Sequence, residues 1–194
     1  MRMRLHSVEE CIFYREWLHL PKDQFNILAM IAASGGAYRG NLTDICNYLS
    51  VTPQSRNRSK IRNALTSLKS DRWIDWQSRG ITQILSINPK ATKISLPLAW
   101  VDLVIKHKYS GEVAWANVLK LYIWIVDNKG DKSTNKEIAA SLGVSETTVC
   151  SAKNVLEKEF DIITKRNISE RYFEGGFRTI GQVLEASALW NNIE

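Results

Sequence analysis

Residues 136–156 have the sequence KEIAASLGVSETTVCSAKNVL, and this stretch predicts two short helices joined by a tight turn. Ile138 and Leu142 are four residues apart, so they share one face of a helix. Gly143 suits the left-handed conformation that ends many helices, and the Ser145 hydroxyl can cap the helix that follows. The second helix again has apolar residues at helical spacing, which are Val149, Ala152, Leu156 and Phe160.

The same pattern occurs earlier in the chain. Three apolar positions recur at a constant offset of 93 residues: Ile45, Leu49 and Val51 correspond to Ile138, Leu142 and Val144. Three more recur at an offset of 88 residues: Ile61, Leu68 and Ile74 correspond to Val149, Leu156 and Ile162. The first copy therefore has five extra residues between the two blocks. Because self-similarity at a fixed spacing indicates repeated structural units, we expect two similar modules in one chain.

Further helices are expected around the modules. An apolar helix precedes each one, over residues 25–32 and 118–126. Pro97 is expected to open a helix that runs to about His107, since proline is favoured in the first turn. The tail, Phe177–Ile193, also has apolar residues at roughly helical spacing. We expect this last helix to pack into the core, with a dimer contact as the alternative.

Each module is followed by sequence typical of strands. After the first, two β-rich runs, Trp73–Trp76 and Ile81–Ile87, flank the turn-like residues 77–80. Two such runs around a short glycine-containing turn predict a hairpin. After the second, Ile162–Thr164 and a stretch near Tyr172–Phe173 predict another.

Three helices followed by a β-hairpin are the parts of a winged helix. The expected fold class is therefore mainly α with small β-hairpins (α+β), arranged as two winged helix-turn-helix domains in tandem. The pattern resembles the winged helix-turn-helix superfamily over about residues 21–90 and 113–180. The residues that carry the resemblance are Ile45, Leu49, Val51, Ile61, Leu65, Leu68 and Ile74, and then Ile138, Leu142, Gly143, Val144, Ser145, Val149 and Leu156. We expect a first domain with an N-terminal extension over residues 1–92, a linker helix over 93–112, and a second domain with a C-terminal helix over 113–194.

Two such modules in one chain resemble plasmid replication initiators of the two-module type. The opening module, in which Leu20 and Pro21 precede the first helix, is also similar to the amino-terminal domains of DnaD-like primosomal proteins and phage replisome organisers. These resemblances imply binding to double-stranded DNA, with replication proteins as further partners.

The positive charge of the chain is concentrated in one window. The formal net charge is +6, and residues 53–93 alone hold nine basic residues against Asp71 and Asp75. The nine are Arg56, Arg58, Lys60, Arg62, Lys69, Arg72, Arg79, Lys90 and Lys93. A concentrated basic patch is the electrostatic footprint of a surface that binds polyanions. A solvated, well-charged helix face is the alternative interpretation.

The window suggests how DNA would be contacted. In a helix-turn-helix the second helix lies in the major groove, and here that helix is expected over residues 54–70. With its apolar residues turned inward, the residues expected near base edges are Arg56, Ser59, Arg62 and Asn63. Those expected at phosphates are Arg58, Lys60 and Lys69. Arg79, at the tip of the wing over residues 76–82, is expected to enter a minor groove or grip the backbone. Ordinary surface polarity is the alternative for Arg56, Ser59, Arg62 and Asn63.

The corresponding helix of the second module is expected over Glu146–Glu159 and has a balanced charge. Its outward residues are expected to be Thr147, Ser151, Asn154 and Lys158. These small polar side chains suit DNA contacts, with Lys165 and Arg166 on the strand beyond. An assembly or partner-binding role for this module remains an equal alternative.

Nothing in the sequence predicts an enzyme. The three histidines, His6, His19 and His107, lie near no plausible nucleophile, and the chain has neither a phosphate-binding loop nor a dinucleotide fingerprint. The three cysteines, Cys11, Cys46 and Cys150, are odd in number and far apart, which argues against disulfides and a zinc site. We therefore expect no catalytic residue, no cofactor and no metal.

The sequence also lacks a signal peptide and any uninterrupted apolar run of the ~20 residues that span a membrane. We expect a cytoplasmic protein with no membrane partner. The leading hypothesis is a sequence-specific double-stranded DNA-binding protein that acts in replication initiation of a plasmid, phage or bacterial chromosome. A transcriptional regulator with the same fold is the first alternative. A protein-interaction module of a replisome or partner complex is the second, and a homodimer is compatible with each.

Overall fold

The computed structural model describes residues 10–109, 113–129, 132–171 and 177–186. The chain divides into two compact units, Met1–Leu103 and Val104–Glu194. The described part contains seven α-helices and three small antiparallel sheets, so the expected mixture of α and β structure is confirmed.

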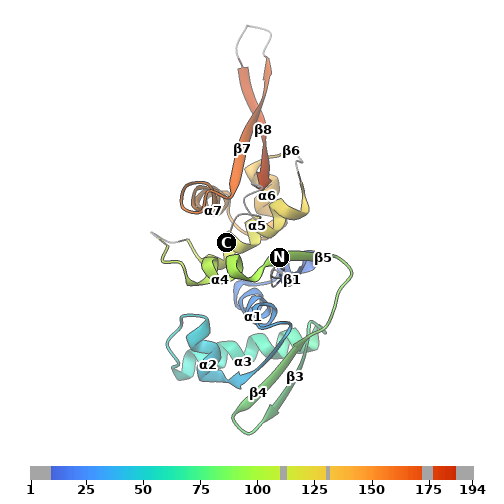
Figure 1. The fold of residues 1–194 in the computed structure, drawn as a ribbon, viewed down its shortest axis with the longest axis vertical. Coiled ribbons are helices and arrows are strands. Elements are labelled where there is room, and N and C mark those ends of the chain that lie inside the picture. The colour runs from blue at the N-terminus through green and yellow to red at the C-terminus, as the bar shows by residue number, and fades with distance from the viewer. Residues whose placement is uncertain (1–9, 110–112, 130–131, 172–176, 187–194) are drawn as a thin grey trace, which may run out of the picture. The chain divides into compact units, whose positions relative to one another are not determined.

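Unit 1 begins with a short strand and a 3₁₀ helix, followed by the first of its helices (Figure 1). In chain order its elements are β1 (Glu10–Tyr14), η1 (Arg15–His19), α1 (Lys22–Ala33), β2 (Ala37–Asn41), α2 (Leu42–Tyr48), α3 (Ser55–Ser70), β3 (Ile74–Arg79), β4 (Thr82–Ile87) and β5 (Lys93–Pro97), and α4 (Leu98–Lys106) crosses its boundary.

Helix α1 forms the centre of unit 1. Every residue from Phe25 to Ala32 is buried, and all of them except Asn26 are apolar. A helix that is hydrophobic on all sides belongs to a core rather than to a surface. Helix α1 accordingly contacts α3, β1 and β4, which confirms the helix predicted over residues 25–32.

A capping box starts helix α2. The Asn41 side chain accepts hydrogen bonds from the backbone N–H groups of Thr43 (2.8 Å) and Asp44 (3.0 Å). In return, the Asp44 carboxylate accepts one from the Asn41 N–H at 2.9 Å. Such a box satisfies donors that have no partner within the helix. Helix α3 follows after a short loop and has Gln54 as its N-cap, in agreement with the predicted helix over 54–70.

The predicted hairpin is present as β3 and β4, but its turn lies further along than expected. Residues 77–79 belong to β3, and the two-residue turn consists of Gly80 and Ile81. Gly80 has φ +60°, the left-handed region, and glycine at the first turn position is typical of a type II′ hairpin turn. Strand β4 lies in the middle of the sheet, in the order β2-β4-β3.

Unit 2 repeats this order of elements. It contains α5 (Trp115–Asp127), β6 (Lys132–Ser133), α6 (Asn135–Leu142), α7 (Glu146–Lys158), β7 (Ile163–Arg171) and β8 (Phe177–Ala186). Its sheet has the order β6-β8-β7, so the last strand again lies in the middle. The internal repeat predicted from apolar spacing therefore extends to the topology of both units.

The turn between α6 and α7 is built as expected. Gly143 has φ +65° and ends α6 in the left-handed conformation. The Ser145 hydroxyl accepts a hydrogen bond from the Thr148 N–H at 3.1 Å and caps α7. Helix α7 ends at Lys158, one residue before the predicted end.

The C-terminal helix predicted over Phe177–Ile193 is wrong for its described part, because residues 177–186 form strand β8. The apolar spacing was misleading for two reasons. Ile180 is an extra residue in a β-bulge, since Ile168 pairs with Gly181 and Ser169 with Thr179. Val183 and Leu184 are adjacent and both buried, so both faces of β8 are covered at this point and the strand shows no alternation of apolar and polar residues there. The remainder of that prediction, residues 187–193, lies outside the described residues.

Two further predictions need adjustment. Strand β7 runs from Ile163 to Arg171 and is longer than expected, whereas Tyr172–Phe173 lie outside the described residues.

The helix predicted from Pro97 is present as α4 and begins at Leu98. The residues before it are strand β5, which pairs with β1. Nothing in the local sequence indicated this small sheet, because its two strands are about 80 residues apart in the chain.

Candidate nucleic-acid interface

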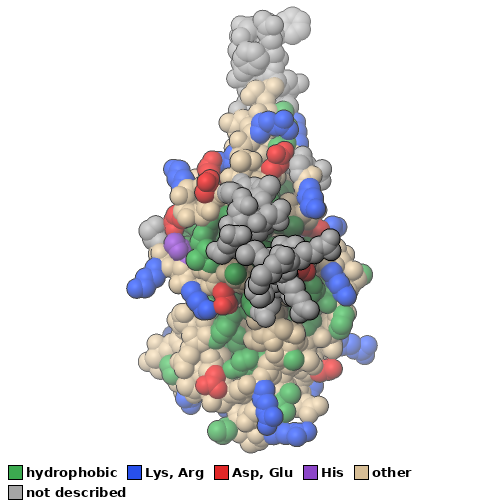
Figure 2. Space-filling model, in the orientation of Figure 1, with side chains coloured by type: hydrophobic (Ala, Val, Ile, Leu, Met, Phe, Trp, Pro, Cys, Tyr) green, Lys and Arg blue, Asp and Glu red, His purple; other side chains and the backbone are tan. Residues whose placement is uncertain are grey.

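Helix α3 turns one apolar side into unit 1 and exposes the rest of its surface. Its buried residues are Ile61, Ala64, Leu65 and Leu68. The residues on it that were predicted to contact DNA are all exposed: Arg56, Arg58, Ser59, Lys60, Arg62, Asn63 and Lys69. Arg79 is exposed as well, at the end of β3, which contacts α3. Lys and Arg side chains lie on the part of unit 1 that carries the β3–β4 hairpin (Figure 2).

The charge of α3 is of one sign. The helix has five basic residues and no acidic residue. The side chains of Arg56, Lys60 and Arg62 make no hydrogen bond or ion pair with any residue that the structure describes. Their charges are therefore not neutralised by the fold, and their donors remain available to an anionic partner.

Arg58 and Lys69 have a second role that sequence reasoning missed. Arg58 Nη2 donates to the Thr43 hydroxyl at 3.0 Å, which ties the start of α3 to α2. Lys69 Nζ donates to the Trp76 carbonyl at 3.1 Å, which ties the end of α3 to the hairpin. Both side chains also retain donors that these bonds do not use. They can fix the angle of α3 within unit 1 while still contacting phosphates.

Lys90 belongs to the basic window of the sequence but not to this surface. Its Nζ lies 4.5 Å from the centroid of the Trp73 ring, within reach of a cation–π interaction. The same atom donates to the Arg72 carbonyl at 3.3 Å. These contacts hold Lys90 beside the start of the hairpin, so its charge is used within the fold.

The tip of the hairpin is organised by a buried glutamine. Gln83 is only 5% exposed, and its Oε1 accepts a hydrogen bond from Trp76 Nε1 at 2.8 Å. Its Nε2 donates to the Ser78 hydroxyl and to the Ile81 carbonyl, each at 3.3 Å. The Ser78 hydroxyl in turn donates to the Gly80 carbonyl at 3.4 Å. These bonds connect both strands to the turn. The sequence analysis singled out neither Gln83 nor Ile81.

The residues predicted on α7 form a separate group in unit 2. Thr147, Asn154 and Lys158 are exposed, and Ser151 is half-buried. Two nearby acidic side chains have partners: Lys165 forms an ion pair with Glu157, and the Glu159 carboxylate lies 2.6 Å from His107 Nε2. Arg166 is exposed on β7. The surface of α7 therefore has much less free positive charge than that of α3.

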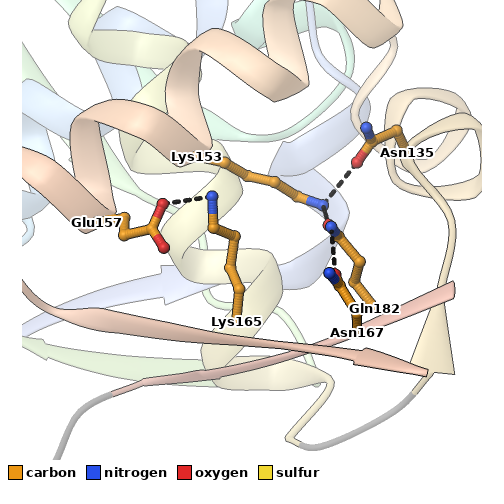
Figure 3. A network of polar contacts seen from close by, with 6 residues as sticks. All are labelled: Asn135, Lys153, Glu157, Lys165, Asn167 and Gln182. Atoms are coloured by element: carbon orange, nitrogen blue, oxygen red, sulfur yellow. Dashed lines mark hydrogen bonds and ion pairs between the residues drawn. The ribbon is translucent and has the colours of Figure 1, made fainter. Parts of the chain in front are cut away.

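Lys153 is not a surface residue, although it lies on α7. It is 3% exposed, and its Nζ donates to Asn135 Oδ1 at 2.6 Å and to Gln182 Oε1 at 2.9 Å (Figure 3). Gln182 Nε2 then donates to Asn167 Oδ1 at 2.9 Å. Burial disfavours the ammonium form and lowers the pKa of Lys153 to about 8. The network links α6, α7 and both strands of the hairpin of unit 2.

Comparison with known proteins gives no family for the chain: no protein-family model matches its sequence, and no curated protein is significantly similar to it. Within the described residues, no group of three or more His, Cys, Asp or Glu side chains is arranged to hold a metal ion. None of the helices in that part of the chain has the length and apolar character needed to cross a membrane.

Proposed function

We propose that this chain is a sequence-specific double-stranded DNA-binding protein built from two winged helix-turn-helix modules. Two observations support the fold assignment. Both units have the order helix, strand, helix, helix and hairpin, and both sheets have the same strand order. In each unit the third helix, α3 or α7, follows a short helix, after the loop 49–54 in unit 1 and the tighter turn 143–145 in unit 2; a recognition helix follows the first helix of a helix-turn-helix in the same order.

The observation that carries the proposal is the one-signed, unpaired charge of α3. A helix of 16 residues is about 24 Å long, and the major groove of B-DNA, about 12 Å wide, admits an α-helix. Arg56 and Arg62 can each donate two hydrogen bonds to a guanine, and Asn63 can pair with an adenine. We assign Ser59 to the same base edges, Lys60 to phosphates, and Arg79 to the backbone or minor groove beside the hairpin.

Unit 2 is proposed to contribute less to phosphate binding. Glu157 and Glu159 near α7 lie against Lys165 and His107, and Lys153 is buried within the unit. Its exposed Thr147, Asn154 and Lys158 remain available for contacts with DNA or with a protein partner.

Replication initiation is the proposed context, on the strength of the two-module architecture. Selection of genomic duplex fragments on the purified protein at near-physiological salt, followed by sequencing, separates the alternatives. Fragments from one locus with closely repeated short sites support initiation. Fragments scattered over promoters favour a transcriptional regulator. If no fragment is retained, the DNA-binding proposal is wrong, and a protein-interaction module becomes the leading alternative.

The site assignment is tested by replacing Arg56 and Arg62 together with alanine. We expect the double variant to lose at least tenfold in affinity for a selected duplex, because each good arginine–base pair contributes about 1–3 kcal/mol of discrimination. It should also discriminate less between the selected duplex and a scrambled one. Fluorescence anisotropy with both duplexes measures the two effects.

The matched control removes the same charge elsewhere in unit 1. The side chains of Lys22 and Lys93 are exposed and make no hydrogen bond or ion pair within the described residues. The variant with alanine at both positions has the same net charge as the arginine variant. It should keep its preference for the selected duplex. Equal discrimination in the two variants would refute the placement of α3 at the bases.

A further inference from the structure

The tip of the β3–β4 hairpin presents an isoleucine almost entirely to solvent. Ile81 is 81% exposed, whereas the other exposed large hydrophobic residues in the described part, Ile12, Val51 and Leu103, are 36–50% exposed. The side chain of Ile81 therefore contributes little to the core of unit 1. A single exposed apolar residue is common on protein surfaces, so the case for a role depends on how the turn below it is built.

The turn holds Ile81 in a defined position. Only Gly80 has positive φ in this turn, and a type II′ arrangement needs glycine at that first position. The backbone of Ile81 is tied to the strands, because its carbonyl accepts a hydrogen bond from Gln83 Nε2 at 3.3 Å. Gln83 is itself held by Trp76 at 2.8 Å. Burying a glutamine is unfavourable unless its amide is hydrogen-bonded, and here both ends of the amide are used at the tip.

The charge around the tip indicates which partner the isoleucine would meet. Arg79 directly precedes the turn and is exposed. The end of α3 is joined to the same hairpin by the bond between Lys69 and the Trp76 carbonyl. An apolar side chain next to an exposed cation, on a hydrogen-bonded turn, suits a DNA duplex, whose phosphates attract the cation and whose stacked bases offer apolar surface.

We propose that Ile81 is an apolar wedge that enters the minor groove and opens the stacking of one base step, which kinks the duplex. This inference rests on the proposed function of α3, since the hairpin can reach the minor groove only when the protein binds duplex DNA. Wedges of this kind insert between base steps and bend the duplex by about 20–90° toward the major groove. Base steps differ in how easily they deform, and this difference affects the binding energy. Ile81 would therefore add sequence preference at a step whose base edges no side chain contacts.

The test uses the full-length protein with Ile81→Thr, which keeps a β-branched side chain in the turn but replaces a two-carbon branch with a hydroxyl. Ile81→Met is the conservative variant, because a long apolar side chain can still insert. Ile12→Thr is the matched control, since Ile12 is an exposed isoleucine on strand β1 of the same unit. Thermal unfolding of each variant confirms that the fold is retained.

Two readouts are measured on a duplex selected from genomic DNA. The first is the bend, by energy transfer between dyes at the two duplex ends. The second is the ratio of two affinities: that for a duplex with one mismatched base pair at the step facing the hairpin tip, and that for the intact duplex. A wedge binds the mismatched duplex more tightly, because a mismatched step takes less free energy to unstack. We expect the wild type to favour the mismatch by roughly tenfold, and Ile81→Thr to lose both this preference and the bend.

The outcomes separate the wedge from the proposed function. Loss of bend and preference in Ile81→Thr, with both kept in Ile81→Met and Ile12→Thr, supports the wedge. If Ile81→Thr binds, bends and discriminates like the wild type, the wedge is refuted while DNA binding stands. If the wild type binds no duplex, both proposals fall.

Discussion

Two lysines on one helix show how much the environment of a residue determines its role. Lys158 and Lys153 are both on α7, yet Lys158 is exposed whereas Lys153 is buried, with 3% of its surface exposed. The ammonium of Lys153 is held by Asn135 and Gln182, which lie 18 and 29 residues away in the chain. A buried amine with neutral amide partners is poorly compensated, and burial lowers its pKa to about 8.

This lowered pKa predicts a specific pH dependence of stability. The folded-state pKa of Lys153, about 8, is below the roughly 10.4 of an unfolded lysine. Between these values the unfolded state binds a proton that the folded state has released, so the contribution of Lys153 to the unfolding free energy increases with pH. The wild type should therefore gain about 2–3 kcal/mol over Lys153→Met between about pH 7 and pH 10.5, by denaturant unfolding.

Lys158→Met is the control for this prediction, because it removes the same charge from the exposed side of α7. Its difference from the wild type should change little over the same pH range. If the unfolding free energies of the two variants depend on pH in the same way, the buried Lys153 ammonium does not cause the pH dependence of stability.

Residue exposure was predictable from the sequence only where helical periodicity decides it. The spacing of Ile61, Leu65 and Leu68 correctly predicts that Arg56 and Arg62 are exposed. The same spacing gives no sign that Arg58 bonds to Thr43 or that Gln83 supports the hairpin tip. Those contacts depend on how separate elements pack, which no local pattern contains.

At the scale of elements, turn and cap residues set the boundaries more firmly than propensity does. Helix α6 ends at Gly143, which has φ +65° and no neighbouring atom within 4 Å of where a Cβ would lie. Any cost of a side chain there is therefore conformational rather than steric. The next helix starts at once, with Ser145 as its cap.

Gly143→Ala should lower the free energy of unfolding by about 1–2 kcal/mol, because a left-handed conformation is unfavourable for an alanine. Gly143→Asn should cost less, since asparagine tolerates this conformation better. Urea unfolding of the three proteins measures both differences. Equal stability of the alanine variant and the wild type would contradict the cap assignment.

The elements that sequence analysis missed have a common feature. Strands β1 and β5 form a sheet only with each other, although most of unit 1 separates them in the chain. Strand β8 was mistaken for a helix because a bulge at Ile180 and the burial of both Val183 and Leu184 remove the alternation that identifies strands. Helices α3 and α7, in contrast, are long and periodic, and their predicted bounds agree with the structure to within one residue.

At the scale of the whole molecule, the two units have the same topology but differ in surface charge. Unit 1 has an unpaired cationic helix face beside a well-anchored hairpin, whereas α7 in unit 2 carries acidic as well as basic residues, with Glu157 paired to Lys165 and Lys153 buried. The repeated scaffold could be inferred from apolar spacing, because that spacing determines the core. The proposed division of tasks between the units depends on which charged side chains bond within the fold, and sequence patterns do not show this.

The most direct test of duplex DNA binding through α3 is the salt dependence of affinity for a selected duplex. If about six cations neutralise phosphates, log K against log salt should have a slope of about −5. Lys60→Ala should reduce the magnitude of this slope by about 1. Lys158→Ala, the same change on α7, should alter it less. A wild-type slope near zero, or equal slopes for Lys60→Ala and the wild type, would contradict the account.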